Sequence, residues 1–163
     1  MLRRILLAGM GIITIGPIGM AAAQPLADAQ ATSGSHSGAC DVATPAEIAK
    51  ATGLTVGDGT AGPPIPGVIG KCTWSGSGDM KVIVTLADAQ HMQLTVASQE
   101  HTGGTVVPDL GSKAVGVRGA GFTGGGYVVS VLDAKGGFGV SILGKDGTPE
   151  RTIALAKLVE SHR

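Results

Sequence analysis

The chain has 163 residues, 12 basic and 12 acidic side chains, and no basic cluster beyond the pair Arg3 and Arg4. Nucleic acids and anionic membrane surfaces require a concentrated basic surface, so this charge pattern argues against both as partners. Aromatic residues make up only 2% of the chain, which also disfavours a stacking platform for bases or sugars.

The first 23 residues have the layout of a secretory signal peptide. After the two arginines comes an apolar run over residues 5–20, and three alanines at 21–23 supply a small-residue cleavage pattern. A membrane anchor is the alternative, but the run is shorter than a span of ~20 residues and contains Pro17, which breaks helices. We therefore predict a periplasmic or secreted protein whose mature form has no stable membrane anchor. Cleavage after Ala29 is a second possibility.

The mature chain divides into a leader and one domain. Residues 24–38 are small and polar, which predicts a flexible leader. Residues 39–163 have the length of a single domain with one modest core. We expect this domain to be a monomer.

Cys40 and Cys72 are the two cysteines of the chain. In an exported protein an even number of cysteines favours pairing, so we predict one disulfide. Such a bridge stabilises the fold by roughly 3–4 kcal/mol on the chain-entropy model. The alternative is a lipid anchor on Cys40, but polar and small residues precede it instead of an apolar run.

The first half of the domain carries one clear helix signal and one hairpin signal. Thr44-Pro-Ala-Glu47 is a capping box with proline at the first helical position, and Gly53 suits the end, which predicts a helix over 45–52. Three prolines and five glycines over 57–70 predict a loop. Alternating apolar residues then predict a hairpin of strands 71–75 and 80–86.

The second half repeats the mixture of helices and strands. Asp88 is a candidate cap for a helix over about 89–100, and Thr148-Pro149-Glu150 opens the last helix. Between them, the pattern predicts a turn at 108–111 and strands at 114–118, 127–132 and 138–143, the last two forming a hairpin around 133–137. The predicted fold class is α+β, a mainly antiparallel sheet flanked by helices.

The motifs of common enzymes are absent or incomplete. Gly119-Ala-Gly121-Phe-Thr-Gly124 matches a dinucleotide-binding pattern, but a strand follows it and the chemistry needs a helix N-terminus. Its remaining functional interpretation is a binding loop. His91 and His101 stand ~15 Å apart on the predicted helix, too far to share a metal ion. We therefore predict no catalytic residues, no metal site and no cofactor.

Trp74 is the single tryptophan and has two interpretations. It either packs over the disulfide in the core or lines a ligand pocket. For a pocket, we expect glycine-rich loops at 57–70 and 119–126 to close over the ligand. The candidate binding residues are Trp74, Pro64, Ile65, Phe122 and Tyr127.

The order of motifs resembles that of a known group of envelope proteins. It comprises Cys40-Asp-Val-Ala-Thr-Pro-Ala-Glu-Ile48, a helix ending at Gly53, a glycine-rich loop, Cys72-Thr-Trp74, Leu110-Gly-Ser-Lys-Ala114, and a hairpin before a final helix. This arrangement is similar to small bacterial cell-envelope proteins and lipoproteins of unknown function, best known from actinobacteria, with a Mog1/PsbP-like fold. The resemblance implies an antiparallel sheet flanked by helices and a corner formed by a helix and the disulfide.

The resemblance implies no catalytic residues. Proteins of this group are thought of as envelope binding or accessory factors, some with acylated glycolipids. The present chain lacks their lipid-anchoring cysteine, so membrane tethering does not carry over.

The leading functional hypothesis is a non-catalytic exported binding module for a small apolar or amphipathic ligand or for another envelope protein. The alternative is a periplasmic protein-interaction or inhibitor domain, in which the same loops form a flat surface. An enzyme is third, and would require His91 to converge with Asp79 or Ser130 in a cleft.

Overall fold

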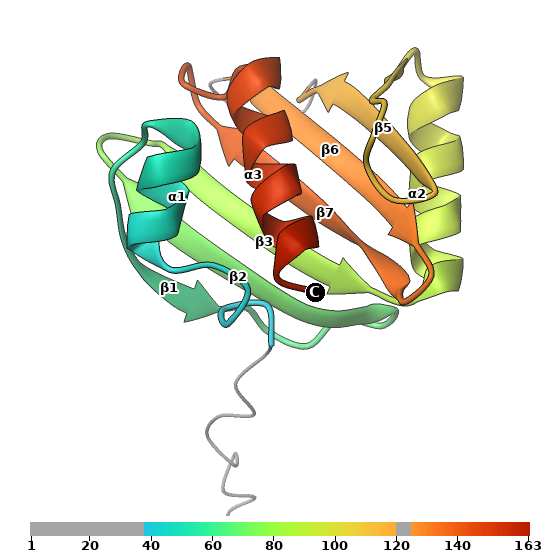
Figure 1. Ribbon diagram of the computed structural model, residues 1–163, viewed down its shortest axis with the longest axis horizontal. Coiled ribbons are helices and arrows are strands. Elements are labelled where there is room, and N and C mark those ends of the chain that lie inside the picture. Colours follow the sequence, from blue (N-terminus) through green and yellow to red (C-terminus); the bar gives the residue numbers. More distant parts are fainter. Residues whose placement is uncertain (1–37, 120–124) are drawn as a thin grey trace, which may run out of the picture. The chain divides into compact units, whose positions relative to one another are not determined.

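The computed structural model describes residues 38–119 and 125–163. Within these residues lie one antiparallel sheet of seven strands, in the order β1-β2-β3-β7-β6-β5-β4, and three helices (Figure 1). The predicted α+β class and antiparallel sheet are therefore confirmed. The strands are β1 (Val56–Ala61), β2 (Val68–Gly76), β3 (Lys81–Ala87), β4 (Thr105–Val106), β5 (Lys113–Arg118), β6 (Gly126–Asp133) and β7 (Gly136–Leu143), and the helices are α1 (Pro45–Thr52), α2 (Ala89–His101) and α3 (Pro149–Ser161).

The helices cover the two faces of the sheet unequally. Helices α1 and α3 pack against each other on one face, and α3 crosses in front of β6 and β7 in Figure 1. Helix α2 lies on the opposite face, against β5, β6 and β7. Successive residues of a strand point to opposite faces: Ala114 belongs to the large core under α1 and α3, whereas Val115 belongs to the smaller core under α2.

The helix boundaries follow the capping signals in the sequence. Thr44 and Glu47 form both hydrogen bonds of the capping box, and Gly53 ends α1 in the left-handed region at φ 72°. The Asp88 side chain accepts a hydrogen bond from the backbone N–H of His91 at 2.7 Å, which fixes the start of α2. The predicted helices over 45–52 and 89–100 are thus confirmed to within one residue.

The predicted loop over 57–70 is wrong in its first and last parts. Residues Val56–Ala61 form the edge strand β1, paired with β2 through an irregular register between Val56 and Gly59, and β2 begins at Val68. The glycine content misled the prediction, because Gly59 marks a close approach of backbone and side chains. A Cβ atom at Gly59 would lie 2.7 Å from both Cys72 Sγ and Trp74 Nε1. The short strand β4 was also not predicted from the sequence.

The predicted disulfide is present and anchors one corner of the domain. Cys40 and Cys72 are bonded, with their Cα atoms 5.0 Å apart, so the segment before α1 is joined to β2. Trp74 is only 1% exposed and, like Cys72, lies against Gly59 in the large core. The inner side of the corner is therefore part of the large core.

The predicted signal peptide over 1–23 and nearly all of the predicted leader lie outside the described residues. Among residues 38–119 and 125–163, no helix has both the length and the apolar character needed to span a membrane.

Substitution of Gly59 by alanine should destabilise the domain. The added methyl group would overlap the disulfide and the Trp74 indole, so we expect the free energy of unfolding to fall by about 1–3 kcal/mol, measured by denaturant unfolding of the oxidised protein. Gly57→Ala is the matched control on the same strand, because its nearest neighbour would be Ser75 O at 3.7 Å. Equal stability of both variants would contradict the close packing of β1 on the disulfide.

Reduction should also destabilise the domain, since the bridge spans 32 residues. We expect no reactive thiol before reduction, and a loss of about 3–4 kcal/mol in the free energy of unfolding afterwards. The double variant Cys40→Ser/Cys72→Ser should have the stability of the reduced protein and be insensitive to reductant. Two reactive thiols in the untreated folded protein would refute the disulfide.

Candidate functional site

The structure does not bring the sequence-predicted binding residues together. Trp74 lies on β2 and is buried, whereas Pro64 and the 43%-exposed Ile65 lie in the connection between β1 and β2. Tyr127 lies on β6, and β3 and β7 separate β6 from β2. Three strand spacings amount to about 14 Å. Phe122 and most of the glycine motif at 119–124 lie outside the described residues.

Tyr127 lines a pocket at the other end of the sheet, which we call the edge pocket. It has a volume of about 750 Å³ and lies between the first turns of α3, the strands β5 and β6, and the segment that follows α2. This volume is in the range of small-molecule sites, about 300–1,000 Å³. Its walls are mainly apolar and include Val106, Val107, Pro108, Val117, Pro149 and Ile153.

The pocket lies beside the shortest strand of the sheet. Strand β4 has two residues, Thr105 and Val106, which pair with Gly116 and Val115 of β5. Pro108 follows two residues after β4, and proline has no backbone N–H to donate to another strand. Strand β4 is therefore a short edge of the described sheet. Val107 is 5% exposed beneath this edge, whereas Val106 is 63% exposed.

Tyr127 supplies a polar group among these apolar walls. Its ring lies over Gly116, because a Cβ atom there would overlap the phenol oxygen and ring. The residue is 7% exposed, and among the described residues no group forms a hydrogen bond with its hydroxyl. Burial raises the pKa of Tyr127, an effect opposed by the positive charge of Arg118 and reinforced by the negative charge of Glu150. The phenol therefore stays neutral and can donate a hydrogen bond.

Two charged residues, Arg118 and Glu150, act on the phenol, and they differ in their own polar partners. The pKa of Glu150 is lowered by hydrogen bonds from its own backbone N–H and from the Thr148 side chain, with a smaller contribution from Arg118. Arg118 lines the pocket and is exposed. It belongs to none of the ion pairs found within residues 38–119 and 125–163.

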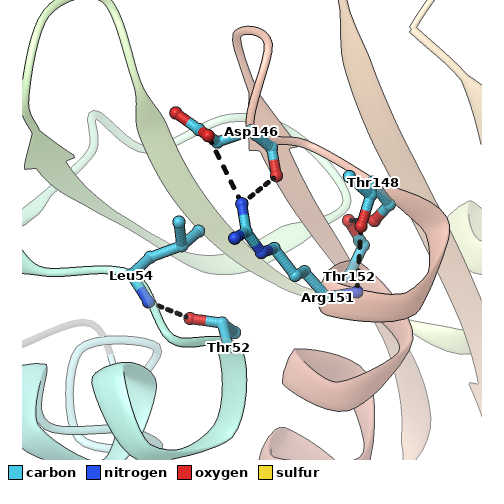
Figure 2. Close-up of polar contacts among 6 residues, drawn as sticks. All are labelled: Thr52, Leu54, Asp146, Thr148, Arg151 and Thr152. Carbon is cyan, nitrogen blue, oxygen red and sulfur yellow. Dashed lines mark hydrogen bonds and ion pairs between the residues drawn. The ribbon is translucent and has the colours of Figure 1, made fainter.

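A second cleft, of about 630 Å³, lies between the end of α1, the β2–β3 hairpin and the start of α3. Figure 2 shows the Arg151 guanidinium turned toward Asp146, where it donates to the carboxylate and to the backbone carbonyl, both at 3.3 Å. Thr52 accepts a hydrogen bond from the Leu54 N–H at 3.2 Å. These polar groups bind one another and hold the local turns, so the edge pocket is the better candidate for a ligand.

Of the residues named for an enzyme, His91 and Asp79 lie far apart and Ser130 is buried. His91 follows the end of β3 and Asp79 precedes its start, so they stand at opposite ends of a strand about 20 Å long. Ser130 is 2% exposed on β6. No group of three metal-binding side chains gathers anywhere in the described ranges.

Sequence reasoning found Tyr127 but missed Gly116, Arg118 and Glu150. The available signal was the register of the β5–β6 pair. It places Arg118 directly opposite Tyr127, but a sequence with an undefined turn between the strands does not fix that register.

Comparison of the chain with protein-family models, with curated proteins and with solved structures gives no match. The resemblance to Mog1/PsbP-like envelope proteins therefore rests on the order of sequence motifs.

The titration of Tyr127 tests the environment of the pocket directly, because the chain has one tyrosine. We expect its phenolate ultraviolet band to appear at higher pH in the native protein than in denaturant, where the pKa is about 10. Below the pKa of the unfolded chain, the raised pKa contributes its full stabilisation of the folded state. This contribution is lost as the pH rises through the folded pKa. An equal or lower midpoint in the native protein would show that the phenol is not buried.

Proposed function

We propose that this protein is an exported, non-catalytic binding protein that holds a small amphipathic molecule in the edge pocket. The observation that carries this proposal is the Tyr127 hydroxyl, a polar group without a described protein partner in a pocket with mainly apolar walls. Such a combination suits a ligand with an apolar body and one polar end. Burial of apolar ligand surface against Val107 and Ile153 would supply most of the binding free energy.

The proposed location is the periplasm or the exterior. Two observations support it: the signal-peptide pattern of residues 1–23 and the Cys40–Cys72 disulfide. Disulfides of this kind persist in oxidising compartments and are rare in the cytosol. We also propose membership of the Mog1/PsbP-like envelope proteins. The antiparallel sheet with flanking helices and the disulfide beside α1 support that assignment.

A second candidate function is the docking of another envelope protein at the same edge. It is favoured by Val106, a large apolar residue 63% exposed on β4, the last strand of the described sheet. Exposed edge strands can pair with a strand of a partner. A small-molecule probe separates this candidate from the first, since it binds a pocket and not a flat edge.

The substitution Val106→Asp tests the pocket, with N-phenyl-1-naphthylamine as a neutral fluorescent probe. A carboxylate in the apolar wall resists desolvation, so we expect the probe to bind about tenfold more weakly. Leu94→Asp is the matched control, because Leu94 is 67% exposed on α2 and does not line the edge pocket. Both residues are mostly exposed, so both variants should fold.

Two results would count against the pocket. Absence of probe binding to the unmodified protein would reject small-molecule binding and favour the docking function. Equal weakening by Val106→Asp and Leu94→Asp would place the probe elsewhere.

A further inference from the structure

The charges at the edge pocket are asymmetric, and this asymmetry bears on the ligand. Arg118 and Tyr127 are directly opposite each other in the β5–β6 register. Side chains of such a pair lie on the same face of the sheet, with Cβ atoms about 4.5–5.5 Å apart. Both residues line the pocket. A cation and a neutral hydrogen-bond donor therefore stand side by side at one place in the pocket.

The acidic neighbour of this pair, Glu150, forms no ion pair with Arg118. Glu150 lies in the first turn of α3, a position that the helix dipole favours for an anion, and hydrogen bonding to its own N–H and to Thr148 lowers the pKa of its carboxyl. Glu150 does not line the pocket, whereas Arg118 does. No described carboxylate lies within ion-pair distance of Arg118. The charged side chain that lines the pocket is thus the cation Arg118.

We propose that the ligand of the edge pocket is an anionic amphiphile, with a carboxylate headgroup bound by Arg118 and Tyr127 and an apolar tail along Val107, Pro149 and Ile153. The inference rests on the function proposed above and names its ligand class. The planar guanidinium offers several N–H donors in a fork that matches a carboxylate. The neutral phenol adds one O–H donor, so the headgroup oxygens gain partners from both sides.

The experiment compares two amphiphiles that differ only in the headgroup. Dodecanoate is an anion at neutral pH and dodecan-1-ol is neutral, and each displaces the fluorescent probe at concentrations below self-association. At low salt we expect the full mature protein to bind dodecanoate about five- to tenfold more tightly than the alcohol. The preference should shrink as salt screens the exposed Arg118.

Variants assign the preference to its source. Arg118→Gln should abolish the preference for dodecanoate over the alcohol. Lys50→Gln is the matched control, since it removes one positive charge from an exposed residue of α1 and should keep the preference. Glu150→Gln should strengthen dodecanoate binding a few-fold, because it removes a neighbouring negative charge, without affecting the alcohol.

The possible failures are distinguishable. Equal affinity for the two amphiphiles, or a preference that survives Arg118→Gln, would overturn the anionic ligand and leave the amphiphile pocket standing. If neither amphiphile nor the probe binds the unmodified protein, the proposed function itself fails.

Discussion

The register of β5 against β6 is the constraint on which the candidate site depends. In that register Arg118 faces Tyr127, and Gly116 lies under the phenol ring. A shift by one residue would move every side chain to the opposite face of the sheet. It would also place Val115 or Val117 under the ring, where the overlap at Gly116 shows that no side chain fits. The same register packs Val129 and Val131 into the large core, so the core and the pocket are fixed together.

The two ends of the sheet use an aromatic residue and a glycine in contrasting ways. At one end Trp74 and Cys72 pack against Gly59, and the disulfide closes the corner. At the other end Tyr127 packs on Gly116, but the neighbouring strand β4 has only two residues. In the first arrangement Trp74 and Cys72 are buried, whereas the second borders the edge pocket of about 750 Å³. The pocket therefore lies where the edge strand of the sheet is shortest.

Local signals in the sequence predicted the helices and the paired central strands well. The capping box at Thr44 and the cap at Asp88 act within a few residues, so their effect is readable without tertiary structure. Strand β1 was missed because its glycines were interpreted as turn residues, although Gly59 is required by the close approach of Cys72 and Trp74. The candidate site was found only in part, because its remaining residues also depend on contacts between strands. Tyr127 stands out in a chain poor in aromatic residues. Arg118 becomes a candidate only when the strand register places it opposite Tyr127, nine residues away.

Buried and exposed residues of the edge pocket would contribute differently to ligand binding. Val107 and Tyr127 are at least nine-tenths buried, so contacts with them exclude water and contribute most to affinity. Arg118 is exposed, and the attraction of an exposed charge is small and screened by salt. Such a charge discriminates between headgroups more than it tightens binding. Glu150 lies in the first turn of α3 and its pKa is lowered there. Its negative charge would repel an anionic ligand and lower the affinity of the pocket for it. For the proposed ligand, the apolar walls would therefore set the affinity and Arg118 the choice of headgroup.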